Sequence, residues 1–179
     1  AIKDGAVELY RNNVKTFSTE SEGVIIQGPE GGNGSLYVYA DEGDDNADKW
    51  VIQAKQASST LTIQNNNGGA WDNNLKCHGD GAVELYYDNV KKFETTSSGV
   101  DVTGSINATG QVKINDSFAY IAGTGSDLQI YHDGTHSYIK NSTANLFIEN
   151  DASGYGLYLR GKSGENSIVC AYDGAVELY

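Results

Sequence analysis

The chain has 179 residues with 24 acidic and 12 basic side chains, and its net charge is −12. This acidic balance repels phosphate backbones, so it argues against a nucleic-acid partner. No apolar run approaches the roughly 18 residues of a membrane-spanning helix, so we expect no membrane insertion. The 39% hydrophobic residues fall in short regular runs, which argues against disorder.

A verbatim repeat organises the sequence. The heptapeptide Asp-Gly-Ala-Val-Glu-Leu-Tyr occurs at 4–10, 80–86 and 173–179, and residues 4–28 match 80–104 at 16 of 25 positions without gaps. The two intervals between copies differ by about one strand-turn-strand module. An array in which each module contacts only its neighbours tolerates such a difference, so we expect a window on a longer repeat array.

The first repeat unit predicts short strands joined by tight turns. Residues 5–10 alternate apolar and polar side chains, and 14–17 and 24–26 follow as further strands. Asn12-Asn13 predicts the first turn, since Asn tolerates positive φ. In the copy at 80–86, the alternation predicts that Val83 and Leu85 face inward and Glu84 faces outward.

The middle of the chain continues in the same manner. Alternating segments predict strands at 36–39, 50–54 and 60–64, and an acidic loop covers 41–48. The Asn-Asn-Asn-Gly-Gly run at 65–69 is a strong turn signal. Apolar spacings of three and four never persist for two helical turns, so we predict no helix.

After the second unit, residues 105–114 predict two very short strands and 119–121 a third. Residues 127–139 predict a hairpin with Asp-Gly at its tip. Further strands are predicted at 145–149 and 156–160.

These patterns predict an all-β, elongated fibrous repeat. The favoured architecture is a trimeric interwoven β-helix or β-prism shaft of short strands, and the alternative is a single-chain β-solenoid. We divide the chain into a first unit at 1–28, a second unit with inserted β modules at 29–104, and further modules at 105–179.

The two cysteines occupy equivalent places. Cys77 and Cys170 each lie three residues before a heptapeptide copy, where the first unit has Ala1. This register favours a small buried hydrophobe. A disulfide between them would require Cα atoms within about 7 Å.

Two segments carry a resemblance to a known family. Residues 80–104 (DGAVELYYDNVKKFETTSSGVDVTG) and 126–141 (SDLQIYHDGTHSYIKN) resemble segments repeated in tail-fibre and related virion structural proteins of marine bacteriophages, cyanophages especially. The resemblance covers about half of the chain. It implies a homotrimeric β fibre located in the virion, which positions a tip that contacts the host surface, and it carries over no catalytic motif.

Motifs for metals and catalysis are weak. His132 and His136 flank the hairpin tip with three residues between them, which favours a solvent-facing pair over a metal site. The acidic run at 44–48 departs from an EF-hand, because Lys49 and Lys55 replace the required Gly and Glu. Glu84 recurs in every copy, which is typical of a structural position. We therefore predict no cofactor, no metal and no enzymatic activity.

Aromatic side chains are the candidates for contact with host glycans. Tyr10 and Tyr86 recur with the repeat and are interpreted as structural. Tyr131, Tyr138 and Trp71 do not recur verbatim, so they are the candidate glycan contacts. The function hypotheses are a non-enzymatic tail-fibre shaft, an extracellular β-solenoid adhesin or filament subunit, and a glycan-depolymerising tail spike with two carboxylates in a groove.

Overall fold

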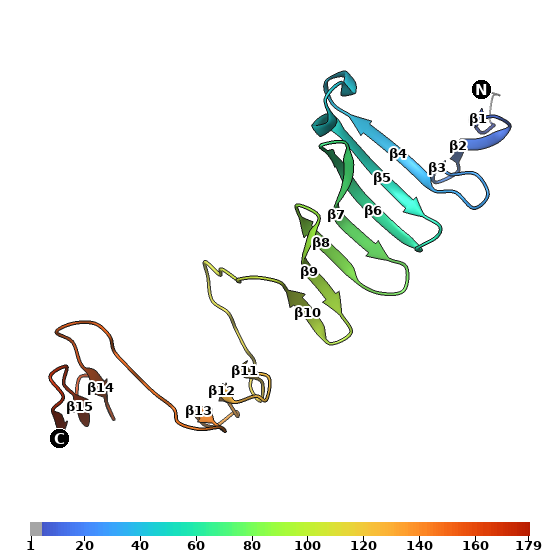
Figure 1. The fold of residues 1–179 in the computed structure, drawn as a ribbon. Helices are drawn as coiled ribbons and strands as arrows, with labels where there is room; N and C mark the ends of the chain where they lie inside the picture. The colour runs from blue at the N-terminus through green and yellow to red at the C-terminus, as the bar shows by residue number, and fades with distance from the viewer. Residues whose placement is uncertain (1–4) are drawn as a thin grey trace. The chain divides into compact units, whose positions relative to one another are not determined.

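The computed structural model describes residues 5–179 (Figure 1). Residues 1–4 lie outside the described residues, and they include Ala1 and Asp4 of the first repeat unit. The protein is all-β, with 49% strand and 3% helix, and its strands form four antiparallel sheets. Two compact units, Ala1–Asn107 and Ala108–Tyr179, are described in turn.

The first sheet of the N-terminal unit is a three-stranded meander. It consists of β1 (Glu8–Arg11), β2 (Val14–Glu20) and β3 (Gly23–Ile26), paired in chain order. Asn12 and Asn13 form the predicted turn with φ values of 49° and 61°. Positive φ at both central residues is what a two-residue type I′ hairpin requires, and this turn type matches the twist of the paired strands.

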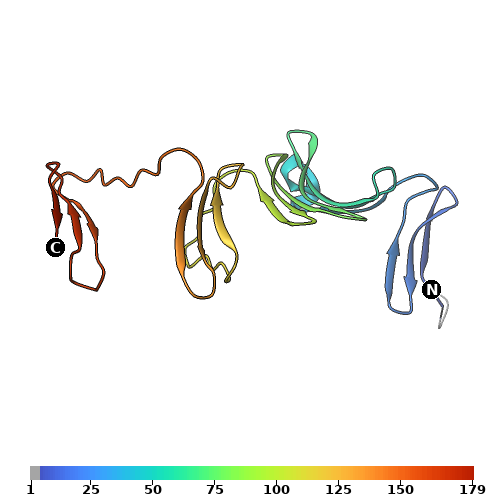
Figure 2. The same cartoon turned by 90° about the horizontal axis from the view of Figure 1, so that it is seen from below.

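The second sheet of this unit has seven strands, again paired in chain order, and it is curved (Figure 2). Its strands are β4 (Gly34–Tyr39), β5 (Lys49–Lys55), β6 (Thr60–Asn67), β7 (Ala70–His78), β8 (Val83–Tyr87), β9 (Val90–Thr96) and β10 (Gly99–Val102). Two 3₁₀ turns, η1 (Asp41–Gly43) and η2 (Asn46–Asp48), lie in the loop between β4 and β5. No helix among residues 5–179 is long and apolar enough to cross a membrane.

The sequence repeat is also a structural repeat. Leu85 pairs with Phe93 between β8 and β9, as Leu9 pairs with Phe17 between β1 and β2. In both copies the register shifts by one residue immediately after this pair, which is a β-bulge. The turn at Asp88 and Asn89 has φ values of 49° and 56°, close to those of the first copy.

The C-terminal unit holds two three-stranded meanders. The first consists of β11 (Ala119–Ala122), β12 (Leu128–His132) and β13 (Ser137–Asn141), and the second of β14 (Leu157–Leu159), β15 (Ile168–Cys170) and β16 (Val176–Leu178). The third heptapeptide copy forms β16. Its Leu178 pairs with Ile168 on β15, in the same register in which Leu85 pairs with Leu75 on β7.

Three predictions about strands are wrong. Residues 105–114 and 145–149 carry no strand, because no neighbouring segment offers them a backbone partner. Their apolar side chains are exposed, with Ile106 at 76% and Phe147 at 72%.

The strand pairing also bears on the predicted β-solenoid alternative. The described strand pairs are all antiparallel and join consecutive strands, whereas the coils of a β-solenoid stack in parallel.

The most informative feature of the fold is how few of the described hydrophobic side chains are buried. Among the described residues, Val51 and Val169 are the only buried hydrophobic side chains, while 37 large hydrophobic residues are exposed. The predicted orientation of the repeat is therefore wrong, because Glu84 is buried at 7% exposure and Leu85 is 42% exposed. Alternation identified which residues share a face, but among the described residues the apolar face of each sheet has no covering layer within its own unit.

Candidate functional site

An apolar ladder crosses the whole seven-stranded sheet on one face. Each strand contributes one large hydrophobic residue, and each residue pairs directly with the next. The ladder consists of Leu36, Ile52, Ile63, Leu75, Leu85, Phe93 and Val102. None of the seven is buried. Directly opposed apolar side chains stabilise a sheet, but an uncovered row of this length also marks an interaction surface.

The other three sheets each carry a shorter ladder of three residues. These ladders are Leu9–Phe17–Ile26, Tyr120–Ile130–Ile139 and Leu159–Ile168–Leu178. Most of their side chains are exposed, including Leu9 at 56% and Leu178 at 77%. Every sheet of the described chain therefore presents an apolar row to its surroundings.

The opposite face of the seven-stranded sheet is polar and largely closed to solvent. Thr62 is fully buried at 0% exposure, and Gln64 follows at 5%. Side chains on this face bond to one another: Gln64 Nε2 donates to Asn73 Oδ1 at 3.1 Å, and Asn73 Nδ2 donates to Asn89 Oδ1 at 3.1 Å. Within the described residues, no buried side-chain nitrogen or oxygen lacks a hydrogen-bond partner. Such a satisfied network rigidifies the sheet.

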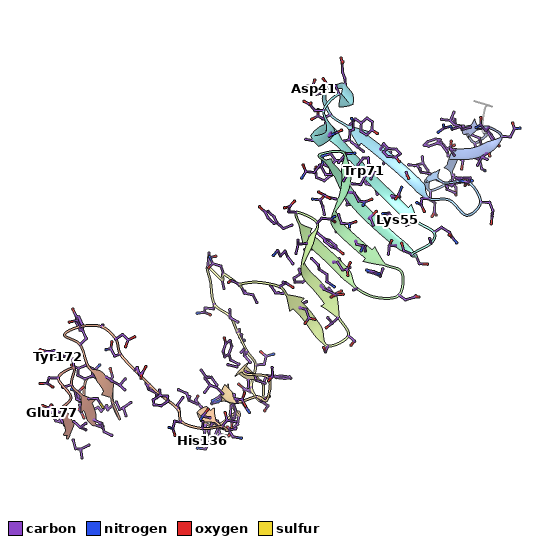
Figure 3. The ribbon with its side chains drawn as sticks, in the orientation of Figure 1. Asp41, Lys55, Trp71, His136, Tyr172 and Glu177 are labelled. Carbon is purple, nitrogen blue, oxygen red and sulfur yellow. The ribbon has the colours of Figure 1, made fainter. Side chains whose placement is uncertain are left out.

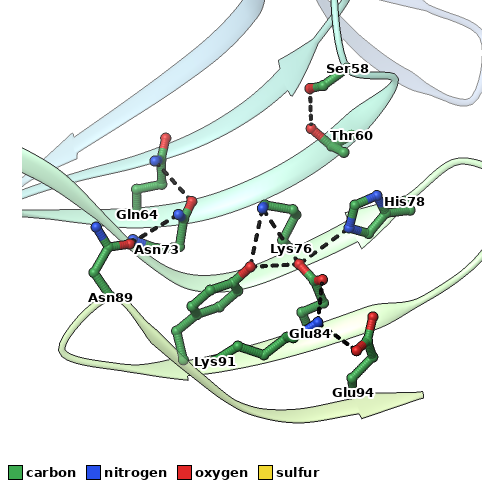
Figure 4. A network of polar contacts seen from close by, with 11 residues as sticks. Ser58, Thr60, Gln64, Asn73, Lys76, His78, Glu84, Asn89, Lys91 and Glu94 are labelled. Carbon is green, nitrogen blue, oxygen red and sulfur yellow. Dashed lines mark hydrogen bonds and ion pairs between the residues drawn. The ribbon is translucent and has the colours of Figure 1, made fainter. Parts of the chain in front are cut away.

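Glu84 is the centre of this polar face (Figure 4). Tyr86 Oη donates to Glu84 Oε2 at 2.6 Å, and Lys91 Nζ donates to Oε1 at 3.2 Å. From the neighbouring strand β7, His78 Nε2 lies 3.2 Å and Lys76 Nζ 3.5 Å from Oε2. Four groups from three strands thus converge on one carboxylate.

The electrostatic consequence is a strongly acidic carboxyl. Burial alone raises the pKa of Glu84, and this is the largest single influence. Hydrogen bonds from Tyr86, His78 and Lys91, together with the charge of Lys76, outweigh it and lower the pKa of Glu84 to about 2. Glu84 is therefore ionised at neutral pH and acts as a fixed negative charge.

The β-bulge explains how Lys91 reaches this cluster. Lys91 lies two residues before Phe93, so regular alternation would place both side chains on the apolar face. The register shift between Leu85 and Tyr86 inserts Lys92 as an extra residue and moves Lys91 to the polar face. The first copy has the same arrangement, with Lys15 Nζ 3.0 Å from Glu8 Oε1.

The three copies differ in how much surrounds the repeated glutamate. Tyr10 donates to Glu8 at 2.7 Å, and Tyr179 donates to Glu177 at 2.5 Å, so the Tyr–Glu contact occurs in every copy. Both glutamates are exposed, whereas Glu84 also receives Lys76 and His78 from β7. The prediction that Tyr10 and Tyr86 serve the structure is consistent with these contacts.

Two of the candidate glycan contacts lie side by side in the C-terminal unit. The rings of Tyr131 and Tyr138 stack with centroids 4.8 Å apart at 18°. Tyr138 Oη donates to Asp133 Oδ2 at 3.0 Å, and Asp133 Oδ1 accepts from the backbone of Thr135 and His136. These backbone bonds, and then that of Tyr138, lower the pKa of Asp133. An apolar hollow of about 570 Å³, lined by Phe118 and others, adjoins them.

Trp71, which is labelled in Figure 3, belongs to the N-terminal unit and lies beside the ring of Tyr37. Its ring centroid lies 6.0 Å from that of Tyr37, which in turn lies 6.1 Å from that of Tyr39. This cluster lies at the end of the sheet next to the acidic loop. Glycan contact by Tyr131, Tyr138 and Trp71 stays a prediction.

The groups considered for metal binding are the carboxylates of the acidic loop and the two histidines of the hairpin. Asp44, Asp45 and Asp48 bring one carboxylate oxygen each within 4.8 Å of the others, on the acidic loop. An exposed acidic group of this kind does not define a metal site without further ligands. At the hairpin, His132 Nδ1 lies 3.1 Å from Ser137 Oγ, and the His136 ring tilts against Tyr138.

The shifted carboxyls bear on the hypothesis of a glycosidase site. Such a site needs one carboxyl whose pKa is raised, so that it can donate a proton. Among residues 5–179, the pKa values of Glu8, Glu84 and Asp133 are shifted, and all three are lowered. Cys77 and Cys170 are free and half-buried in different units, at equivalent register positions opposite Val83 and Val176.

Comparison with known proteins adds no assignment: no protein-family profile, no curated protein and no solved structure matches this chain.

Proposed function

We propose that this chain is a non-enzymatic structural segment that associates with copies of itself through its apolar ladders, as the shaft of a homotrimeric tail fibre or spike. The exposed ladder on every sheet carries the proposal. The resemblance of residues 80–104 and 126–141 to bacteriophage tail-fibre segments supplies the biological setting, a virion part that positions host-recognition elements.

A single copy of the chain leaves most of its large hydrophobic side chains exposed. A chain of about 180 residues that folded as a globule would bury roughly 70% of the surface of its unfolded form around a core. Two buried hydrophobic residues do not make such a core. Burying apolar surface contributes about 25 cal/mol per Å², so covering the ladders would stabilise the molecule.

Covering the apolar face of the sheet with further copies of the chain would leave the hydrogen bonds of the polar face intact. The polar face is already satisfied by its own hydrogen bonds, so it gains little from further contacts. The net charge of −12 keeps the outer surface soluble and opposes non-specific aggregation. Three copies whose apolar faces meet around an axis would bury the ladders and leave the charged side chains outside.

The lowered pKa values of the shifted carboxyls support a structural role over hydrolysis. Glu84 is held by four partners, which is typical of a structural carboxylate.

Sedimentation equilibrium of the purified chain tests the proposal. A homotrimer has a mass of three times 19.2 kDa, and the assembly should resist dilution into the nanomolar range. A species of 19.2 kDa at every concentration would refute self-association. Incubation with bacterial surface polysaccharide, followed by a reducing-end assay, distinguishes this function from glycan depolymerisation.

A further inference from the structure

The hairpin between β6 and β7 ends in a run of three asparagines followed by two glycines, and the three asparagines differ in how they are held. Asn65 Nδ2 donates to two backbone carbonyls, at 2.9 and 3.1 Å. Asn66 is buried, and its Oδ1 accepts from the backbone N–H of Gly69 at 3.0 Å. Asn67 is exposed, and within residues 5–179 its side chain makes no hydrogen bond. Of the three side chains, that of Asn67 is therefore the one that can rotate.

The residue after Asn67 leaves its backbone nitrogen open to this side chain. Asn67 and Ala70 form the last pair of the ladder, so the N–H of Gly68 lies in the turn, outside the hydrogen bonds of the ladder. Gly68 has a φ of 64°, and nothing lies within 4 Å of the place that a Cβ on it would occupy. Because glycine has no side chain, nothing shields its nitrogen from Asn67 Cγ.

A side-chain amide and the backbone nitrogen that follows it can react with each other without an enzyme, which makes asparagine a thermolabile residue. The Gly68 nitrogen loses its proton and attacks Asn67 Cγ, and the new N–Cγ bond closes a cyclic imide. The Cγ–Nδ2 bond breaks, and the amide nitrogen leaves with that proton as ammonia. Water then opens the imide at either carbonyl, which gives aspartate or isoaspartate. Water is consumed, ammonia is released and no electron is transferred.

We infer that Asn67 is a site of spontaneous covalent modification, deamidated through a cyclic imide with Gly68. The product adds one negative charge to a chain whose net charge is −12. In the isoaspartate product, the backbone also gains one carbon beside the pair that Asn66 forms with Trp71. The modification thus changes both the charge and the strand geometry at this end of the sheet, and it does not depend on the proposed function.

The chain contains a second Asn-Gly step, Asn33-Gly34, which is a matched control. Asn33 Oδ1 accepts from the backbone N–H of Gln56 at 3.1 Å. The backbone of Asn33 also lies so close to Gly28 that a Cβ on that glycine would not fit. Reaction at Asn33 requires the bond from Gln56 to break first. One hydrogen bond corresponds to a factor of about two to ten in rate, so we expect Asn33 to react more slowly than Asn67 by this factor.

The experiment incubates the full chain at neutral pH and physiological temperature in water enriched in heavy oxygen. Water supplies the new oxygen of the product, so incorporated label marks deamidation that occurred during the incubation. Peptide mass spectrometry follows both Asn-Gly steps and separates aspartate from isoaspartate by fragmentation. We expect label at Asn67 to accumulate about two- to tenfold faster than at Asn33. In concentrated urea, which removes the fold, the two steps should react at similar rates.

Two glutamine variants assign the reaction to its residue. The longer side chain of glutamine would have to close a larger ring, so Asn67→Gln should remove most of the label that the folded chain incorporates at its Asn-Gly steps. Asn33→Gln should remove little of it.

Two outcomes would overturn the inference. If label accumulates at Asn33 as fast as at Asn67 in the folded chain, the structure gives no selectivity between them. If both steps are labelled in urea but neither in the folded chain, the hairpin tip protects Asn67. Neither outcome depends on the mass of the assembly, so this test and the sedimentation test of the proposed function can fail separately.

Discussion

The hydroxyl of Tyr86 lies 2.6 Å from Glu84 Oε2, two residues earlier on the same strand. The same contact joins Tyr10 to Glu8 at 2.7 Å and Tyr179 to Glu177 at 2.5 Å. The repeated heptapeptide therefore encodes a local clamp on one face of a strand. In the second copy, the clamp sits beside β7 and becomes the centre of a buried network.

Removing the charge of this network should destabilise the N-terminal unit. Glu84→Gln leaves Lys76 without its carboxylate and leaves Lys91 paired with Glu94 alone, and we expect a loss of about 2 kcal/mol in the free energy of unfolding. This is below the 3–5 kcal/mol of a fully buried pair, because Lys91 is 39% exposed and solvent screens its charge. Urea denaturation followed by Trp50 and Trp71 fluorescence measures it, since both residues belong to this sheet.

The first copy provides a matched control for that substitution. Glu8→Gln removes the same clamp where the glutamate is exposed and where, among the described residues, its hydrogen-bond partners are Tyr10 and Lys15. We expect no measurable change in stability. Equal losses for the two variants would contradict the role assigned to Lys76 and His78.

The pKa of Glu84 also predicts how stability depends on pH. A carboxyl whose folded-state pKa is lowered contributes stability above its unfolded pKa, here 4.5, and loses it as the pH falls through the folded pKa of about 2. The difference in melting temperature between wild type and Glu84→Gln should shrink as the pH falls from 4.5 to 2. A difference that grew over this range would contradict this assignment.

The sequence predicts only part of the structure of the repeat. The positions of β1, β5 and β6 and the positive φ of Asn12 and Asn13 follow from alternation and from turn chemistry. The bulge after Leu85 could not be predicted, because no residue type marks it. Without the bulge, Lys91 is assigned to the wrong face and the Glu84 cluster is missed.

Which face of the sheet is buried could not be predicted from the sequence, for a different reason. Alternation places Val83 and Leu85 on one face and Glu84 on the other, but it does not say which face is covered. In this single-layer sheet the polar side chains pack against one another and are buried, whereas the apolar side chains on the other face stay largely exposed. The false strands at 105–114 and 145–149 reflect a related limit, since apolar residues predict a strand only where a backbone partner exists.

The hairpin turn of the second copy allows a test of backbone strain. Asp88 has a φ of 49°, which glycine adopts freely and a β-branched residue does not. Asp88→Val should cost about 1–2 kcal/mol of stability, whereas Asp88→Gly should be neutral or slightly stabilising. Urea denaturation of both variants compares them, and equal effects would show that the turn relaxes in solution.

The ladder predicts a position at which association is sensitive to charge. Ile63 is on β6, an interior strand of the seven-stranded sheet, and Ile63→Glu places an unpaired carboxylate in the proposed interface. We expect association to weaken by roughly 30-fold or more, as an uncompensated buried charge costs at least about 2 kcal/mol. Sedimentation velocity across a dilution series measures it.

A charge added elsewhere is the control for that variant. Ala57→Asp introduces a carboxylate in the exposed turn between β5 and β6, away from the ladder. It should leave the sedimentation profile unchanged. If both variants weaken association equally, then the effect arises from net charge and the ladder is not the contact surface.

The most direct measurement of the central claim is the mass of the intact chain in solution. The exposed ladders predict one sedimenting species of three times 19.2 kDa that persists on dilution and that Ile63→Glu dissociates. A stable 19.2 kDa monomer at all concentrations would contradict the account, because its apolar faces would then remain uncovered in water.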